Sequence, residues 1–339
     1  MKKIRKITAL ALCMIFMMSF VGCGDKKEKD KDGLKEIVFC LDWTPNTNHT
    51  GLYVALEKGY YKEAGFDVKI VQPPEGGATA MCASGQAQFA IDAQDTFAAS
   101  LDSDTPLEIT AVAGILQHNT SGIISRADEG MDSPKGLEGK TYATWDSPIE
   151  QAMIKYVMKA EGADFSKVKL IPNTITNEAA TLEAKQTDAV WIFYGWSGIN
   201  AELAGLDFDY WDFASITEEL DYYTPIIVAN NKYLKENAED AKKFMEATEK
   251  GYEFAANNPK EAADILIKGD ETGSLRGSEE LVYKSQEWIS KQYIADASKW
   301  GVIDENRWNS FYKWLYDNKL TKSDLTGKGF SNEYIKAED

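Results

Sequence analysis

The chain has 339 residues and a mass of 37.8 kDa, which is too long for one ordinary domain and suits two domains of roughly 100–200 residues each. Hydrophobic residues make up 44% and charged residues 27%, a composition that forms packed cores and excludes a largely disordered chain. The formal net charge of −17 would repel a phosphate backbone, so we do not expect nucleic acid as a partner.

The first 22 residues have the order of a secretory signal. Basic residues within Met1–Lys6 precede the apolar run Ile7–Val21, which is short for a membrane span. The segment Phe20–Cys23 resembles a bacterial lipobox, although Leu is usual where Phe20 stands. We therefore predict a signal peptide over residues 1–22, lipidation of Cys23 and a charged tether over residues 23–34. The alternative is an uncleaved signal anchor.

Removal of this signal would leave 33 basic and 54 acidic residues, a net charge of −21. It would also leave Cys40 and Cys82 as the only cysteines besides Cys23. Two cysteines make neither a disulfide framework nor a metal site. We predict that both are buried free thiols, with a single bridge between them as the alternative.

The hydrophobic pattern alternates strands and helices from residue 36 to about residue 228. Apolar runs predict strands at Ile37–Leu41, Asp67–Val71, Phe89–Ile91 and Leu107–Ala113. Apolar residues at helical spacing predict helices at His49–Tyr61, Gly77–Ser84 and Gln94–Leu101. Because continuous apolar strands alternate with helices, we expect a parallel sheet covered on both faces.

A second α/β unit begins near His118. Its strands are predicted at Lys140–Trp145, Val168–Ile171, Ala189–Phe193 and Phe208–Trp211, followed by a returning strand at Ile226–Ala229. Ser147 and Glu150 can form a capping box that opens a helix, and further helices are predicted at Asn177–Ala184 and Gly198–Ala204. The rest is almost wholly helical, at Lys232–Asn257, Pro259–Lys268, Ser278–Ala295 and Glu305–Tyr316.

This order of elements predicts an α/β fold with two parallel-sheet lobes, a ligand cleft between them and a helical C-terminus. We expect the first lobe to comprise residues 35–117 and 222–339, interrupted by the second lobe at residues 118–221. The sequence holds no phosphate loop, no hydrolase nucleophile motif and no cysteine or histidine pair at metal-ligand spacing. We therefore expect no catalytic residue, no metal and no cofactor.

Aromatic residues directly follow several predicted strands. Trp43 comes after the first strand, Trp145 ends a strand of the second unit, and Tyr194 and Trp196 follow the strand that contains Trp191. The carboxyl ends of parallel strands face the binding crevice, where such rings could stack on a flat heterocycle. The alternative is that they are core aromatics, which we favour only for Trp191 because it lies inside an apolar strand.

The segment Leu41–Ile70 closely resembles the opening of the thiamine-pyrimidine-precursor binding proteins of ABC importers, which are relatives of the yeast-type thiamine pyrimidine synthase. The residues that carry the shared pattern are Asp42, Trp43, Pro45, Asn46, His49, Tyr53, Ala55, Gly59, Tyr60 and Gly65. Gly85–Ile91, Ile115–His118 and Thr187–Val190 match later blocks of this family, so the resemblance covers roughly residues 36–260.

This resemblance implies a periplasmic-binding-protein type II fold that closes on a small ligand and delivers it to a membrane permease. We expect a lipid-anchored, extracytoplasmic monomer that binds a thiamine-related pyrimidine of the formylaminopyrimidine or hydroxymethylpyrimidine type. Its partners would be an ABC permease and the ATPase of that importer. The synthase relatives use a cysteine-rich iron-binding stretch that this sequence lacks, so we expect a binding protein and no enzyme.

Other ligands and other classes of protein stay open at this point. Riboflavin or another aromatic heterocycle is the first alternative ligand. A sulfonate, taurine or nitrate anion comes next, although the mature chain would offer only Arg126, Arg276 and Arg307 as arginines to bind it. A pyrimidine synthase and a structural or adhesive lipoprotein are the alternatives outside transport.

We expect both lobes to contribute to the ligand site. The expected ligand-binding residues are Asp42, Trp43, Asn46, His49, Asp92, Gln94, Trp145, Tyr194 and Trp196. The resemblance also implies an acidic residue after the aromatic block, near the place that Ser197 takes here. Which acid replaces it is open, and the candidates from the sequence are Asp42, Asp92, Asp95 and Glu150.

Overall fold

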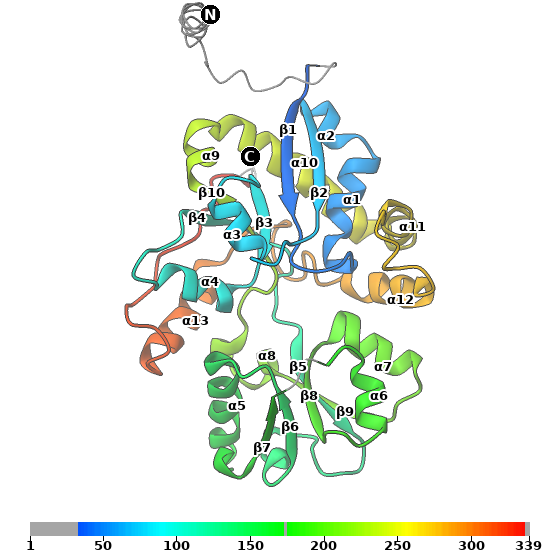
Figure 1. Cartoon of the computed structure of the whole chain (residues 1–339), viewed down its shortest axis with the longest axis vertical. Coiled ribbons are helices and arrows are strands. Elements are labelled where there is room, and N and C mark those ends of the chain that lie inside the picture. Colours follow the sequence, from blue (N-terminus) through cyan, green and yellow to red (C-terminus); the bar gives the residue numbers. More distant parts are fainter. Residues whose placement is uncertain (1–32, 173–174, 336–339) are drawn as a thin grey trace, which may run out of the picture.

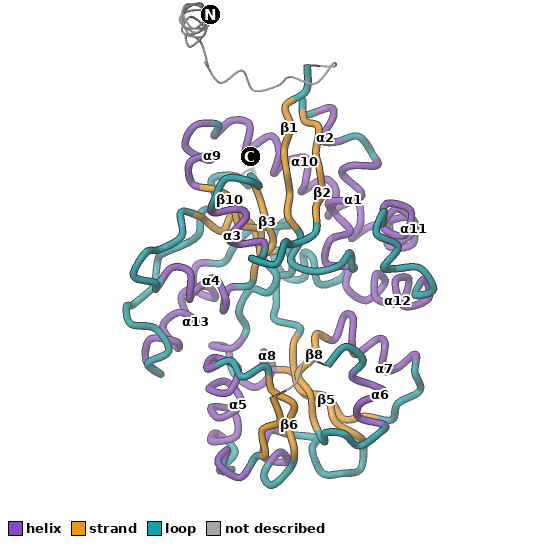
Figure 2. Tube along the Cα trace, viewed as in Figure 1, coloured by secondary structure: helices purple, strands orange, loops and turns teal. Residues whose placement is uncertain are grey.

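The structure is a computed structural model that describes residues 33–172 and 175–335 (Figure 1). The predicted signal, Cys23 and most of the predicted tether lie outside these residues. Figures 1 and 2 show two lobes, each with strands in its middle and helices beside them. In the described part, no helix is both long enough and apolar enough to cross a membrane.

The first sheet has the strand order β2-β1-β3-β10-β4. Its strands are β1 (Lys35–Cys40), β2 (Phe66–Val71), β3 (Phe89–Asp92), β4 (Ile109–Gly114) and β10 (Ile226–Asn230). Phe39 and Phe89 point to one face of this sheet, where Phe244 of helix α10 (Ala238–Asn257) packs on Phe89 with ring centroids 4.3 Å apart. This aromatic contact anchors the long helix to the sheet.

The second sheet has the order β7-β6-β8-β5-β9. Its strands are β5 (Ser121–Arg126), β6 (Thr141–Thr144), β7 (Lys169–Pro172), β8 (Ala189–Phe193) and β9 (Phe208–Asp212). Successive side chains of β8 alternate between the two faces, as in any strand. Trp191 belongs to the core under helix α5 (Pro148–Ala160), whereas Ile192 packs with residues of α6 (Glu178–Glu183) and α7 (Ile199–Leu203).

One strand in each sheet runs antiparallel to its neighbours. The sheets are therefore mixed, whereas the sequence predicted parallel sheets. β10 pairs antiparallel with β3 and β4, and β5 pairs antiparallel with β8 and β9. Both reversed strands come directly after the chain has crossed from one sheet to the other. A strand that enters at the edge where its neighbours end has to run away from that edge, and this reverses its direction.

Strand β5 was not predicted, because its sequence, SGIISR, has only two large apolar residues, Ile123 and Ile124. The predicted helix at His49–Tyr61 is two helices, α1 (Thr50–Glu57) and α2 (Tyr60–Glu63). They are separated by Gly59, whose φ of 79° is a left-handed conformation that ends a helix. The predicted helix at Lys232–Asn257 likewise divides at Asn237 into α9 (Asn231–Glu236) and α10.

Four other helices lie close to their predicted positions, namely α3 (Ala78–Ala83), α4 (Gln94–Leu101), α11 (Pro259–Gly269) and α13 (Glu305–Asp317). Helix α12 (Glu279–Ile289) ends six residues before the predicted end at Ala295, and the short helix α8 (Phe213–Ile216) was not predicted. Helix α13 also contacts the second lobe, because its Trp314 packs edge-on against Tyr156 of α5 with centroids 5.5 Å apart. The C-terminal helices therefore touch both lobes.

Cys40 and Cys82 are buried free thiols, which confirms the preferred interpretation over a disulfide. Burial raises the pKa of the Cys40 thiol to about 11. Burial also raises the pKa of Cys82, and both groups therefore stay protonated near neutral pH. These two cysteines act as small apolar core residues.

Candidate functional site

The expected ligand-binding residues gather at the carboxyl ends of the strands in both sheets. Asp42 and Trp43 follow β1, and Asp92 is the last residue of β3. Trp145 follows β6, and Tyr194 follows β8. These strand ends lie where the two lobes meet (Figure 1), as the alternating sequence pattern predicts for an α/β binding protein.

His49 holds Asp42 in place. The imidazole is fully buried, and its Nε2 lies 2.8 Å from Oδ1 of Asp42. Its Nδ1 accepts a hydrogen bond from the backbone N–H of Asn46, so Nε2 carries the proton that Asp42 accepts. His49 is thus inaccessible to a ligand, and its role is to orient the exposed carboxylate of Asp42.

Asn46 caps the short turn that leads into α1. Its Oδ1 accepts from the backbone N–H of Asn48, and its Nδ2 donates to the carbonyl of Thr44. The turn is fixed from behind, because α1 and α10 approach so closely that a Cβ on Gly51 would lie 2.2 Å from the ring of Tyr252. The loop that carries Asp42 and Trp43 therefore has a rigid base.

Asp92 and Gln94 have their polar atoms engaged within the protein. The carboxylate of Asp92 accepts hydrogen bonds from the hydroxyls of Thr79 and Thr96 and from the backbone N–H of Ala93. Burial nevertheless raises its pKa, with a contribution from the nearby charge of Asp42. Gln94 is fully buried, and its amide bonds the backbone of Trp308 and Tyr223, so a ligand would reach it only by displacing these bonds.

Trp145 stands on a strained loop that a buried carboxylate holds in place. Half of its surface is exposed, and the next residue, Asp146, has a φ of 61°. Glu150 accepts from the backbone N–H of Trp145 and also from the hydroxyls of Tyr142 and Thr144. The capping box predicted from the sequence is present, and Glu150 is occupied in supporting Trp145.

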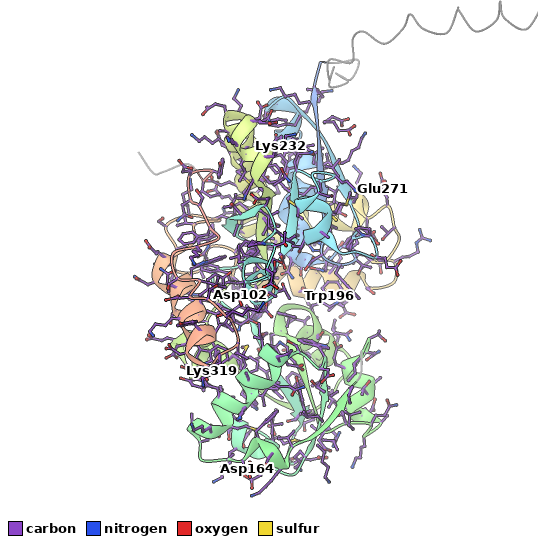
Figure 3. All side chains as sticks on the ribbon, turned by 60° about the vertical axis from the view of Figure 1, so that its left-hand side comes forward. Asp102, Asp164, Trp196, Lys232, Glu271 and Lys319 are labelled. Carbon is purple, nitrogen blue, oxygen red and sulfur yellow. The ribbon has the colours of Figure 1, made fainter. Side chains whose placement is uncertain are left out.

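Residues 194–198 form a single turn of π-helix, η4, that joins β8 to α7. Tyr194 lies against Gly198, where a Cβ would come within 2.7 Å of its ring, and its hydroxyl donates to Glu202. Trp196 is half-buried and packs on the core of the first lobe, and Figure 3 shows it at the junction of the lobes. Ser197 donates a hydrogen bond to Oε1 of Glu178 over 3.1 Å.

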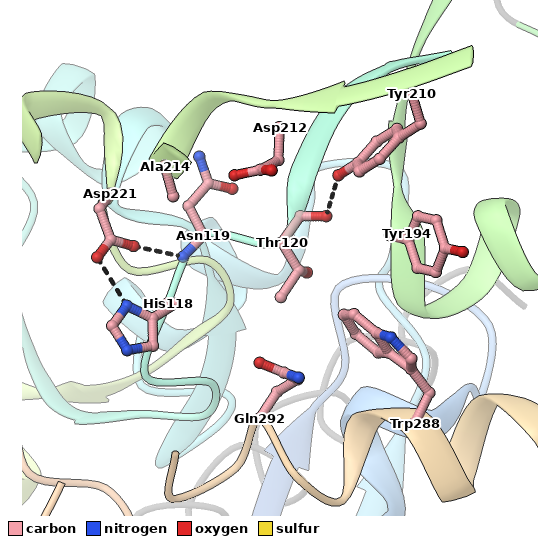
Figure 4. A pocket seen from close by; sticks show the side chains of 10 residues that line it. All are labelled: His118, Asn119, Thr120, Tyr194, Tyr210, Asp212, Ala214, Asp221, Trp288 and Gln292. Atoms are coloured by element: carbon pink, nitrogen blue, oxygen red, sulfur yellow. Dashed lines mark hydrogen bonds and ion pairs between the residues drawn. The ribbon is translucent and has the colours of Figure 1, made fainter. Parts of the chain in front are cut away.

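A cavity of about 640 Å³ opens beside this turn, and we call it the inter-lobe cavity (Figure 4). Tyr194, Tyr210 and Trp288 form an aromatic side, with Tyr194 and Trp288 centroids 5.3 Å apart. Asp212 and the amide of Gln292 lie on opposite sides of the opening. Its lining residues are His118, Asn119, Thr120, Tyr194, Tyr210, Asp212, Ala214, Asp221, Trp288 and Gln292.

An ion-pair network at this cavity joins the segment before β5, which contains His118, to the segment after α8, which contains Asp221. Nδ1 of His118 lies 2.7 Å from Asp221, and its Nε2 lies 3.0 Å from Asp296. Arg307 contacts both carboxylates, at 3.2 and 3.7 Å. The hydrogen bond to Asp221 raises the pKa of His118 above its usual value.

The structure divides the expected site residues between two faces of the second sheet. Trp145 packs with Trp191 on the α5 side, with ring centroids 5.6 Å apart, whereas Tyr194 points to the α6–α7 side and lines the inter-lobe cavity. Trp288 and Gln292 were absent from the sequence-based set. They lie in and after a C-terminal helix, and only the folded chain brings them to Tyr194.

Residues 46–262, more than half of the chain, match the family described as NMT1/THI5 like. The chain belongs to this family. It is 28% identical over 316 residues to a formylaminopyrimidine-binding protein of Halalkalibacterium halodurans, which covers 91% of this chain and 92% of that protein. It is 24% identical over 243 residues to the yeast 4-amino-5-hydroxymethyl-2-methylpyrimidine phosphate synthase THI5, covering 67% of this chain and 69% of the synthase.

Solved structures show the fold. The periplasmic aliphatic sulphonate binding protein SsuA of Escherichia coli superposes with a TM-score of 0.64 and 12% identity, covering 89% of this chain and 99% of that chain. The NMT1/THI5-like chain is therefore an α/β protein with a periplasmic-binding-protein fold and a helical C-terminus, as the sequence predicted. In the described residues, no group of three or more potential ligands is arranged to hold a metal ion.

Proposed function

We propose that this protein is the extracytoplasmic solute-binding protein of an ABC importer and that it binds a thiamine-related pyrimidine. The ligand would be of the formylaminopyrimidine or hydroxymethylpyrimidine type. The observation that carries the proposal is the similarity to a formylaminopyrimidine-binding protein along nine-tenths of both chains. The aromatic side chains at the strand ends of both lobes support a flat ring as the ligand.

In the proposed complex the ring enters between the lobes and contacts both. Trp43 is 64% exposed and Trp145 is 50% exposed, although burial of such rings is usually favourable. A ligand that touches Trp43 on one lobe and Trp145 or Trp196 on the other would favour a closed arrangement, because it makes more contacts there. Asp42, Asn46, His49, Asp92, Gln94 and Tyr194 complete the proposed site, several of them as supports for the residues that touch the ligand.

A strongly anionic ligand is less compatible with the charges of the described residues. Arg126 is paired with Glu129 and Asp188, and Arg307 is paired with Asp221 and Asp296. These arginines are therefore already neutralised by carboxylates. The similarity to a sulphonate-binding protein supports the fold but not the same ligand.

We propose a binding role and not catalysis, although the family includes synthases. The 339 residues have cysteines only at positions 13, 23, 40 and 82, so they lack a cysteine-rich stretch. We further propose that the protein is a monomer, that it is anchored to the membrane through Cys23 and that it docks on a permease with its ATPase. The lobe boundaries at residues 118 and 222 are part of the same proposal.

A thermal-shift panel tests the ligand class. The purified protein is mixed with 4-amino-5-hydroxymethyl-2-methylpyrimidine, formylaminopyrimidine, riboflavin, an alkanesulfonate or nitrate. We expect a rise in melting temperature with the pyrimidines, because a ligand that binds only the folded state stabilises it. Stabilisation by the anions alone would contradict the proposal. Turnover that depends on added iron would instead identify a synthase.

A further inference from the structure

We propose that Glu178 is the residue that recognises the hydrogen-bond-donating edge of the ligand, and that Ser197 positions it. The inference rests on the proposed function, because it assumes that a pyrimidine binds at the strand ends. Glu178 opens helix α6, whereas Ser197 belongs to the turn η4, so the two residues come from different elements. Glu178 is not among the candidate acids expected from the sequence.

The contact with Ser197 brings this carboxylate to the junction of the lobes. Ser197 comes directly after Trp196, which packs on the core of the first lobe. The Ser197 hydroxyl donates to Oε1 of Glu178 over 3.1 Å, and both residues are half-buried. Glu178 is therefore bonded to the residue that directly follows an aromatic residue of the proposed site, and part of its surface is accessible.

Two other carboxylates near the strand ends are already engaged. Asp92 accepts three hydrogen bonds, and Glu150 supports the Trp145 loop, so neither has much remaining capacity for a ligand. Asp42 accepts a hydrogen bond from His49 and is exposed, but it follows β1 of the first sheet and is not part of the turn after β8.

Glu178 differs from Asp92 and Glu150 in its partners. Within the described residues, it has a single hydrogen bond, from a neutral hydroxyl, and no ion pair. An ionised carboxylate has about four lone-pair sites. Ser197 uses one site on Oε1 of Glu178, so Oε2 and the second site on Oε1 can accept hydrogen bonds from a ligand. Glu178 therefore has the capacity to accept two hydrogen bonds from one molecule.

The geometry of a carboxylate suits one edge of an aminopyrimidine. Its two oxygens can accept from the exocyclic amino group and from a protonated ring nitrogen beside it, which forms a paired, charge-assisted contact. In a ring with an oxygen in place of the amino group, that oxygen would face one carboxylate oxygen. Both atoms are acceptors, so neither would have a hydrogen-bond donor. Such a mismatch at a buried edge costs about 1–3 kcal/mol, which would make Glu178 a determinant of specificity.

The test compares binding of two probes by calorimetric titration. The first probe is 4-amino-5-hydroxymethyl-2-methylpyrimidine, and the second carries an oxygen in place of the 4-amino group. We expect Glu178→Gln to weaken binding of the amino probe at least about tenfold and to reduce the preference for it over the oxo probe. Glu183→Gln is the matched control, because Glu183 is exposed on the same helix, and it should bind both probes like wild type.

A second variant keeps the test independent of local packing. In Glu178→Ala/Ser197→Glu the carboxylate moves to the other side of the observed hydrogen bond, and we expect this double variant to regain much of the preference for the amino probe. Unchanged affinity and preference in Glu178→Gln would overturn the inference while leaving the proposed function intact. Failure of the wild-type protein to bind any pyrimidine would overturn the proposed function itself.

Discussion

The hydroxyl of Ser285 donates a hydrogen bond to the backbone carbonyl of Gly195. Ser285 lies in α12, and Gly195 lies in η4 at the end of β8. The same hydroxyl is 2.6 Å from Oγ1 of Thr47, which donates to it because a hydroxyl carries only one proton. One buried serine therefore links the turn before α1 to the turn between Tyr194 and Trp196.

We predict that Ser285→Ala destabilises the protein by about 1–3 kcal/mol, because it leaves the Gly195 carbonyl and the Thr47 hydroxyl without this partner in a buried place. Urea unfolding measures the change in free energy. Ser274→Ala, at an exposed position before the same helix, should change stability by less than about 0.5 kcal/mol. Equal stability of Ser285→Ala and wild type would show that the link contributes nothing.

Trp43→Ala and Trp196→Ala should each weaken binding of the pyrimidine at least about tenfold, because each removes a ring that would stack on it. Trp43 is well exposed, so its loss should leave the melting temperature almost unchanged. Tyr316→Ala, which removes an exposed ring of α13, is the control for binding. If both tryptophan variants bind the ligand as wild type does, the aromatic clamp is wrong.

Trp191→Ala should act mainly on stability. Trp191 is 4% exposed and packs on Phe213 with ring centroids 4.2 Å apart. Loss of a buried tryptophan leaves a cavity and costs about 3–5 kcal/mol. Thermal unfolding of the ligand-free variant measures this cost, and an unchanged melting temperature would contradict the assignment of Trp191 to the core.

Stability should depend on pH through His118. The pKa of His118 is raised by its hydrogen bond to Asp221, so the folded state binds the proton more tightly than the unfolded state. This contribution is fully present below the unfolded pKa of about 6.5 and is lost as the pH rises through the higher folded value. Asp296 and Arg307 also face the imidazole, with opposite effects on its charge.

Urea unfolding between about pH 5.5 and 9 measures how the free energy of unfolding changes as His118 loses its proton. We expect the free energy of unfolding of wild type to fall across the window relative to that of His118→Gln, which cannot bind the proton. Parallel curves for the two proteins would show that the His118 network does not couple protonation to folding.

Membrane anchoring is tested separately, because Cys23 lies outside the described residues. Cells that express the full chain are labelled with a fatty-acid probe. We expect label on wild type and none on Cys23→Ala, since the predicted lipidation needs the thiol. Labelling of both proteins at the same level would exclude Cys23 as the anchor.

Local sequence signals predicted most of the elements. Helix α4 has the predicted bounds, and the capping box of Ser147 and Glu150 is formed. The reversal of β5 and β10 was not predictable from apolar runs, since direction depends on which edge the chain enters after each crossing. Gly59 could have indicated the break between α1 and α2.

The site was less accessible to sequence reasoning. The predicted strand ends indicated Trp43 and Trp145 as site residues. The position of Gln94 in the sequence, however, cannot show that its side-chain amide bonds the backbone of Trp308 and Tyr223. Trp288 and Glu178 were missed because each meets the β8 turn through tertiary packing, from positions far from it in the sequence or on a neighbouring helix.

Native mass spectrometry of the purified protein, followed by titration with formylaminopyrimidine, shows directly whether the protein binds a pyrimidine. We predict one pyrimidine per chain, either retained from the expression host or bound on titration, and we expect neither a sulfonate nor nitrate to displace it. A protein that binds no pyrimidine, or that binds an anion in its place, would contradict the proposed function.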